Sequence, residues 1–331
     1  MNSLAEKDIQ IHSVTPLLHS LALSKLMSTG TEVFIKCENA QPTGSFKVRG
    51  IGRLANKLKK DGYERLIGAS GGNAGLAISY ASQVIGMPCT VFVPVTAPKN
   101  SVQRIKEYGA EVKIIGNCYA EAEKYALKEA EKQGNAFLSP YDDPEVWKGH
   151  STIIDEIKAS LPRKPSALVV ADGGGGLLLG VLQGLQSVGW QDVPVLAMET
   201  CGADCFNLAV EAKRVVVLEK ITSIAKCLGA SSVPPYLLEV LPDFNVTSRV
   251  ISDETALESC IRFADDERIV VEPACGAALA AVYGGVLSRL QIEGIIPTFT
   301  TGPVVVIVCG GAGVSLQMLQ NWATELNIKF P

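Results

Sequence analysis

Lys47 is the residue of this 331-residue sequence whose type and setting most directly suggest chemistry. It follows Pro42-Thr43-Gly44-Ser45-Phe46, a stretch that predicts the first turn of a helix at Lys47. The positive end of a helix and burial both favour a neutral lysine amine. A neutral amine can form a Schiff base with a carbonyl compound or act as a base. Most lysines at helix starts are simply solvated, but the uncharged neighbours of Lys47 favour a functional role.

Three glycine-rich loops each follow a predicted strand and are predicted to open a helix. Free N–H groups and a partial positive charge at a helix start form a potential anion site. Four consecutive glycines let backbone amides surround a phosphate without obstruction by Cβ atoms. Tight turns for helix packing are the alternative, and three such loops together argue against it. The loops are Ser70-Gly71-Gly72-Asn73-Ala74-Gly75, Gly173-Gly174-Gly175-Gly176-Leu177 and Gly310-Gly311-Ala312-Gly313.

Nucleotide binding is a competing interpretation of such loops. A dinucleotide fold needs a Gly-x-Gly-x-x-Gly pattern and an acidic residue about twenty residues further on. The pattern is absent in its usual form, and Glu199 alone lies at roughly the right distance after the tetraglycine loop. No Gly-Lys-Ser/Thr motif of a nucleotide phosphate loop occurs. The support for NAD or ATP is therefore weak.

The composition excludes several classes of protein. Hydrophobic residues make up 47% and charged residues 19%, so the chain can bury a large core and is not intrinsically disordered. A net charge of −4 gives no basic surface for nucleic acid or anionic lipid. Residues 1–16 lack an apolar signal core, and the uncharged stretches 173–191 and 273–288 are expected to be buried helices, not membrane spans. Nine cysteines without a CxxC pair suggest reduced thiols and a cytoplasmic location.

Short apolar stretches alternate with helical patterns along the chain. Several of the apolar stretches are continuous, as in parallel strands buried on both faces. Such alternation predicts an α/β fold with crossover connections. Strands are expected at 33–36, 66–69, 89–93, 112–115, 136–138, 167–171, 195–198, 245–250, 269–272 and 304–309. The clearest helices are expected at 45–60, 73–85, 119–132, 253–265 and 274–290.

The motifs together resemble those of the fold-type II pyridoxal phosphate (PLP) enzymes. Ser45–Gly50, the loops at 70–75 and 173–176, and Cys309-Gly310-Gly311 carry the resemblance. Within that family the chain is most similar to the serine/threonine dehydratases, and nearest to the animal serine dehydratase-like group. The resemblance runs from about Thr15 to about Gln320. Further matching segments are Trp147-Lys148-Gly149-His150, Met198-Glu199-Thr200 and Val271-Glu272-Pro273-Ala274-Cys275-Gly276-Ala277-Ala278.

The resemblance implies a role for each matching residue of the cofactor site. Lys47 would hold PLP covalently, Phe46 would lie against the pyridine ring, and Asn73 would hydrogen-bond the ring hydroxyl. Cys309 would face the pyridine nitrogen. The cofactor phosphate would be bound by Gly173, Gly174, Gly175 and Gly176.

The resemblance also implies a substrate loop and a cation site. Gly71 replaces the alanine of the liver-type enzymes, which suggests a looser loop and low activity. Cys205 replaces a more usual serine, and its thiol is a poor ligand for a hard cation such as K⁺. The substrate carboxylate would be bracketed by Ser70, Gly71, Asn73 and Ala74. The cation would lie near Glu199, Ala203 and Cys205, with the carbonyls of Leu228 and Ala230.

The implied architecture is two open, twisted, mostly parallel sheets flanked by helices. Residues 1–47 and 146–331 would form a large PLP-binding domain, and residues 48–145 a small inserted domain on the substrate side. A homodimer is the family expectation, with a small amino acid as the binding partner and no nucleic acid or membrane.

The implied reaction is β-elimination of L-serine to pyruvate and ammonia, or of L-threonine to 2-oxobutyrate. A thiol facing the pyridine nitrogen would not keep that nitrogen protonated. A neutral pyridine ring stores less carbanion charge, which would favour elimination over transamination. Three alternatives stay open: serine racemisation, another PLP reaction on the same scaffold, and a weakly active cofactor-binding protein. The cysteine synthases usually have Thr-Ser-Gly-Asn-Thr in the carboxylate loop, and Ala69-Ser70-Gly71-Gly72-Asn73 argues against their β-replacement reaction here.

Overall fold

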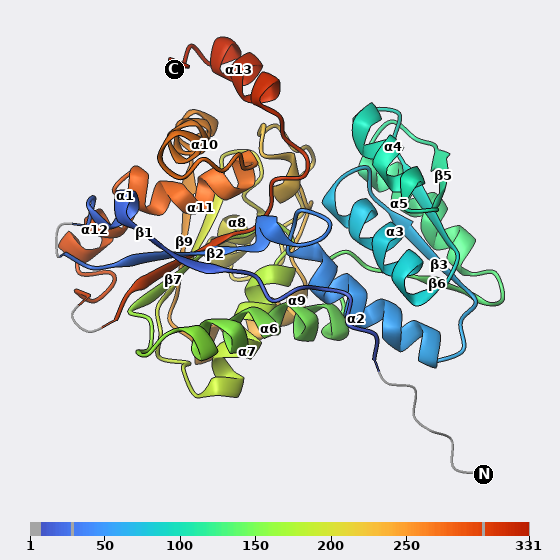
Figure 1. The fold of residues 1–331 in the computed structure, drawn as a ribbon, viewed down its shortest axis with the longest axis horizontal. Coiled ribbons are helices and arrows are strands. Elements are labelled where there is room, and N and C mark those ends of the chain that lie inside the picture. The colour runs from blue at the N-terminus through green and yellow to red at the C-terminus, as the bar shows by residue number, and fades with distance from the viewer. Residues whose placement is uncertain (1–7, 28–29, 300–301, 331) are drawn as a thin grey trace. The chain divides into compact units, whose positions relative to one another are not determined.

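A computed structural model describes residues 8–27, 30–299 and 302–330, which form two compact units (Figure 1). Unit 1 comprises residues 8–13 and 41–149, and unit 2 comprises residues 14–40 and 150–330. The sequence analysis put the boundaries at 47/48 and 145/146, with Lys47 in the larger domain. In the structure Lys47 lies in unit 1, because it begins helix α2 (Lys47–Lys60), which packs against α3 (Asn73–Ile85) of the same unit.

Unit 2 contains a sheet of six strands in the order β1-β2-β10-β7-β8-β9. Every neighbouring pair is parallel except β1 with β2. All residues of β7, β8 and β10 are buried, which explains why these strands are almost continuously apolar. The strands are β1 (Leu17–Ser20), β2 (Val33–Cys37), β7 (Ala167–Ala171), β8 (Val195–Thr200), β9 (Val246–Ile251) and β10 (Val304–Val308).

Helices cover both faces of this sheet (Figure 1). The buried helix α11 (Pro273–Tyr283) contacts β7, β8 and β10, and α10 (Asp253–Glu267) packs on α11. Helix α7 (Gly176–Val188) lies on the opposite face. Helix α6 (Pro144–Ser160) contributes residues 144–149 to unit 1 and its remainder to unit 2. The other α-helices of unit 2 are α1 (Leu21–Ser24), α8 (Cys205–Ala212), α9 (Pro235–Val240), α12 (Val286–Ile292) and α13 (Leu316–Glu325), and its short 3-10 helices are η1 (Glu38–Ala40), η2 (Lys226–Leu228) and η3 (Leu241–Asp243).

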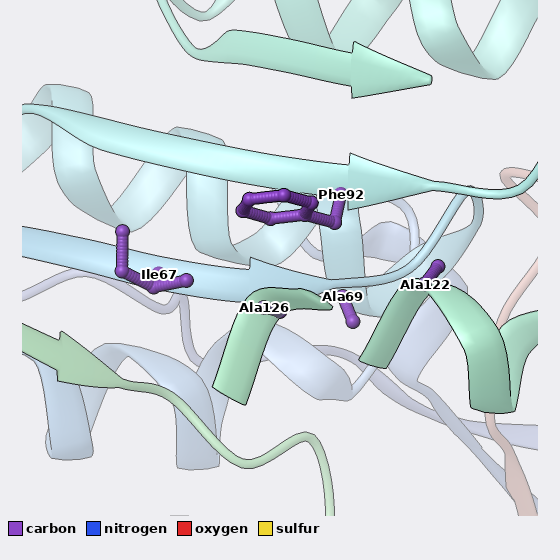
Figure 2. Close-up of a cluster of buried hydrophobic side chains, with 5 residues drawn as sticks. All are labelled: Ile67, Ala69, Phe92, Ala122 and Ala126. Carbon is purple, nitrogen blue, oxygen red and sulfur yellow. The ribbon is translucent and has the colours of Figure 1, made fainter. Parts of the chain in front are cut away.

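Unit 1 contains a parallel four-stranded sheet in the order β5-β4-β3-β6. Alternate residues of a strand face opposite sides. Accordingly, Ile67 and Ala69 of β3 pack with Phe92 against Ala122 and Ala126 of α5 (Figure 2). Gly68 between them faces Ile78 of α3. The elements are β3 (Arg65–Ala69), β4 (Cys89–Val93), β5 (Glu111–Ile114), β6 (Asn135–Phe137), α4 (Lys99–Glu107) and α5 (Tyr119–Ala130).

The α/β class and the two mostly parallel sheets are confirmed, but three sequence expectations are wrong. Residues 269–272 form no strand, and the N–H of Glu272 donates to Gly310 O in the loop after β10. The single helix expected at 274–290 is divided into α11 and α12 at Gly284-Gly285, where Gly285 has a φ of +66°. The loop at 310–313 does not open a helix, because α13 begins at Leu316 with Ser315 as its N-cap.

In the described ranges, no single helix is long and apolar enough to cross a membrane. Helices α11 and α12 meet the length and composition requirement only as a pair, and that pair is bent by 43°.

Phe92→Ala tests the core of unit 1, because Phe92 is 4% exposed and packs against α5. We expect the substitution to lower the free energy of unfolding by about 3–5 kcal/mol. Leu127→Ala is the matched control, since Leu127 lies on α5 but is 47% exposed. It should change stability by less than about 0.5 kcal/mol. Urea unfolding followed by circular dichroism measures both, and equal losses would contradict this packing.

Candidate functional site

Lys47 is half-buried at the start of α2, as the sequence predicts. Its amine donates a hydrogen bond to the backbone carbonyl of Pro140 at 2.9 Å. The same Nζ lies 5.0 Å from the ring centroid of Phe46, the residue before it. An aromatic face attracts a cation at this distance. The Lys47 amine is therefore oriented by the Phe46 ring and the Pro140 carbonyl.

The loop Ser70–Ala74 connects β3 to α3, and Asn73 is the first residue of that helix. The hydroxyl of Ser70 accepts a hydrogen bond from the N–H of Gly72 at 3.2 Å. A Cβ on Gly75 would lie 2.1 Å from Ser70 O, so the chain can turn this tightly only with glycine there. The result is a tightly turned helix start, and backbone amides at a helix start can bind a carboxylate.

Gly71 has no room for a side chain. A Cβ at this position would lie 2.4 Å from the Cβ of Ala97, which belongs to the turn after β4. The methyl group that Gly71 lacks would therefore meet Ala97. The turn that contains Ala97 therefore occupies the space that a side chain at position 71 would need, so the glycine does not leave an open gap at this point of the loop.

The tetraglycine loop of unit 2 connects β7 to α7. A Cβ on Gly173 would lie 2.9 Å from both Cα and O of Leu228, and Gly175 has a left-handed φ of +77°. Gly175 is the N-cap of α7, which leaves the first amides of the helix without partners within the helix. This geometry fits a phosphate group, because side chains would otherwise fill the cradle.

Glu199 is fully buried at the end of β8. Its carboxylate accepts hydrogen bonds from the N–H groups of Phe206 at 2.9 Å and Asn207 at 2.7 Å, in the first turn of α8. Burial raises the pKa of Glu199 to about 9, and the charge of Asp172 adds to the shift. Asp172 is adjacent because Ala171 of β7 pairs with Met198 of β8.

The other residues predicted for a cation site make protein hydrogen bonds. The thiol of Cys205 donates to Gly173 O at 3.2 Å, and burial raises the pKa of this thiol. The N–H of Ala203 donates to Thr200 O, and the carbonyl of Leu228 accepts from the N–H of Ala230 at 2.8 Å. Across residues 8–27, 30–299 and 302–330, no three His, Cys, Asp or Glu side chains are grouped to hold a metal.

Cys309 directly follows β10, and its sulfur lies 3.2 Å from the sulfur of Cys275. The Cys275 thiol also contacts Gly310, donating to its carbonyl at 2.8 Å and accepting from its N–H at 3.1 Å. The hydrogen bond with Cys275, together with burial, raises the pKa of Cys309 well above its usual value. Cys309 is therefore held as a neutral thiol.

The predicted residues divide between the two units. Unit 1 holds Phe46, Lys47 and the Ser70–Ala74 loop, and unit 2 holds the tetraglycine loop, Glu199 and Cys309. Sequence reasoning did not anticipate contacts from Pro140 or Asp172, or the pairing of Cys275 with Cys309. The contact from Pro140 is made by its backbone carbonyl, and every residue has one, so the residue type could not predict this contact.

Glycine cradles at the ends of parallel strands, with a lysine at a helix start, are the features of a PLP-dependent enzyme. Residues 10–310 match the family described as pyridoxal-phosphate-dependent enzymes. The chain belongs to this family.

The similar proteins include both dehydratases and ammonia-lyases. The human protein named serine dehydratase-like is 48% identical, with 97% of this chain and 96% of that protein covered. The mouse L-serine dehydratase/L-threonine deaminase is 47% identical, with 96% and 97% covered. The structure of a fungal L-serine ammonia-lyase from Rhizomucor miehei has a TM-score of 0.88 and 34% identity, covering 95% of this chain and 99% of that one.

Glu199→Gln tests the buried carboxyl group. A free glutamic acid ionises near pH 4.5, whereas folded Glu199 keeps its proton up to about pH 9. Between these values the folded state binds more protons, so the free energy of unfolding falls as pH rises. Glu199→Gln should remove up to about 1.4 kcal/mol per pH unit of this fall. Urea unfolding in K⁺-free buffers from pH 5 to about pH 9 measures the slope. Exposed Glu258→Gln is the control, and equal slopes in all three proteins would refute the assignment.

Gly71→Ala tests the close approach of the two loops. The added methyl would overlap with Ala97, so we expect a loss of about 1–3 kcal/mol in the free energy of unfolding. Removing the opposing methyl in Gly71→Ala/Ala97→Gly should recover most of this loss. The cycle is completed by Ala97→Gly alone, measured by urea unfolding. Additive effects of the two substitutions would show that the methyl groups do not meet.

Proposed function

We propose that this chain catalyses the β-elimination of L-serine to pyruvate and ammonia, and of L-threonine to 2-oxobutyrate and ammonia. The single observation that carries the proposal is the Lys47 amine, held at a helix start within a chain of the PLP-dependent family. The names of the human and mouse relatives and of the fungal structure support this substrate class.

The cofactor residues follow from the same proposal. Lys47 would bind PLP covalently, with Phe46 against its ring and Asn73 on its ring hydroxyl. Gly173–Gly176 would hold the phosphate, and Cys309 would face the ring nitrogen. When bound, PLP supplies the electron sink for the bond that breaks at the α-carbon.

The chain's own residues would position the substrate and move one proton. The amides of the Ser70–Ala74 loop would bind the substrate carboxylate. The Nζ of Lys47 would take the proton from the α-carbon. The β-hydroxyl gains one proton as it leaves as water, which balances the proton that Nζ removes from the α-carbon. A water molecule later hydrolyses the released enamine to the 2-oxo acid and ammonia. A neutral Cys309 thiol would leave the ring nitrogen unprotonated, which favours elimination over transamination.

A monovalent cation, K⁺ in particular, is part of the proposal. Glu199 is a buried carboxyl group that a cation would ionise, and the carbonyls of Ala203, Leu228 and Ala230 could supply oxygen ligands. Cys205 would contribute little, because a thiol is a poor ligand for K⁺. Repeating the Glu199→Gln comparison with and without K⁺ tests this site. Homodimer assembly and a cytoplasmic location stay predictions.

Serine racemisation is the second candidate. The structure of maize serine racemase has a TM-score of 0.82 and 25% identity, with 96% of this chain covered. Measuring D-serine alongside pyruvate separates the two reactions, because elimination consumes serine whereas racemisation conserves it.

Lys47→Ala is the decisive variant. The purified protein with PLP should have a visible absorption band and release 2-oxo acid from L-serine and L-threonine. Lys47→Ala should lose the covalent band and at least about 10³-fold in kcat. Lys57→Ala is the control, because Lys57 lies on the same helix but is exposed and pairs with Asp61.

The outcomes separate the candidates. A band with 2-oxo acid release supports the lyase, and a band with D-serine but no 2-oxo acid supports the racemase. A band that shifts with serine but yields neither product indicates a weakly active binder. The absence of a band after PLP addition would refute the cofactor assignment.

A further inference from the structure

The carbonyl that accepts the hydrogen bond from Lys47 belongs to a short segment, residues 139–143, that precedes α6. Pro140 is 93 residues from Lys47 along the chain, and its carbonyl oxygen lies 2.9 Å from Nζ. A carbonyl can only accept hydrogen bonds. It can therefore orient the amine through one N–H without placing a full negative charge beside it. A carboxylate in its place would stabilise the charged ammonium instead.

Three hydrogen bonds fix the shape of segment 139–143. The indole N–H of Trp147 donates to the carbonyl of Tyr141 at 2.6 Å. The N–H of Asp142 donates to the hydroxyl of Ser139 at 3.0 Å, and the carboxylate of Asp143 accepts from the N–H of Glu145 at 2.7 Å. Trp147 holds the residue next to Pro140, and it is 5% exposed.

The start of α6 is itself tied to α2, the helix that begins at Lys47. The guanidinium of Arg53 donates to the carboxylate of Glu145 at 2.7 Å. A Cβ on Gly149 would lie 2.5 Å from both Arg49 O and Gly50 Cα, so the backbones of the two helices are in direct contact. The Trp147-Lys148-Gly149 motif therefore joins α2 to the segment that Lys47 contacts.

We propose that Trp147 is a positioning residue for Lys47, acting through the carbonyls of Tyr141 and Pro140. The inference rests on the proposed role of Lys47 as the amine that binds PLP and takes the substrate proton. A lysine side chain loses up to about 2 kcal/mol of rotamer entropy when it is fixed in one conformation. Because the acceptor is rigid, the lysine loses that entropy when the protein folds, and its amine is already oriented when it reacts.

Trp147→Phe tests the proposal, because phenylalanine keeps an aromatic ring but removes the donor to Tyr141 O. The first measurement is the rate at which the visible band forms when PLP is added to the PLP-free protein. In that step Nζ joins the aldehyde carbon of PLP and one water is lost. We expect this rate and kcat for L-serine each to fall about tenfold, with KM changed less than about threefold. The affinity of the PLP-free protein for inorganic phosphate should be unchanged.

Two controls separate positioning from folding. Trp190→Phe is the matched substitution in unit 2, where the Trp190 ring lies 5.9 Å from the amine of Lys158. It should leave both rates unchanged. Replacing Trp147 with 3-benzothienylalanine keeps the size and shape of indole but removes the N–H, and it should reproduce the slow phenotype. Thermal unfolding of each protein identifies any variant that fails to fold. If Trp147→Phe fails to fold, the rates of the benzothienyl variant decide the test.

Equal rates in the wild type, Trp147→Phe and the benzothienyl variant would overturn the positioning role. So would a change in KM alone, or normal rates in the benzothienyl variant with slow rates in Trp147→Phe, which would assign the effect to packing. None of these results bears on the proposed function. That function fails separately if the wild-type protein forms no band with PLP.

Discussion

A parallel strand with both faces buried is mostly apolar, so most of its polar groups lie where it ends. In unit 2 all residues of β7, β8 and β10 are buried, and Asp172, Glu199 and Cys309 lie at or just beyond the carboxyl ends of these strands. The tetraglycine loop begins at the same edge. In unit 1 the fully buried strand β4 lies beside β3, which leads into the Ser70–Ala74 loop. The burial of the sheets thus places most of the candidate site residues of each unit at the carboxyl ends of its strands and in the loops that follow them.

The same burial controls charge around the tetraglycine loop. Glu199, Cys205 and Cys309 all have raised pKa values, with burial as the first or second cause. Near neutral pH these groups are therefore uncharged, and the Cys205 thiol can donate to the Gly173 carbonyl. The backbone amides of the tetraglycine loop lie at this edge and are suited to an anionic phosphate. The exclusion of water from this edge of the sheet therefore both packs the strands and keeps the Glu199, Cys205 and Cys309 side chains uncharged.

Local patterns predicted much of this molecule, and contacts between distant residues account for the rest. The strands at 89–93 and 167–171 match the observed bounds because each is a continuous buried stretch. Lys47 and two glycine loops could be located because a helix start and a glycine cluster are visible in sequence. The break at Gly284-Gly285 was missed although the two glycines are visible in the sequence, because the apolar pattern continues on both sides of them. Pro140, Asp172 and the Cys275–Cys309 contact could not be found, because each depends on chain segments brought together by folding.

The pairing of β2 with β10 has a consequence for how the protein is made. Val33 lies beside Val304 in adjacent parallel strands, so two central strands of one sheet come from nearly opposite ends of the chain. During synthesis at about 5–20 residues per second, β2 leaves the ribosome roughly 15–50 seconds before its partner. Residues 41–149 have by then all been made and can form their own sheet. Unit 1 can therefore fold cotranslationally. Strand β2 can pair early only with β1, and its other edge stays open until β10 is made, the kind of exposed strand edge that is prone to wrong pairing.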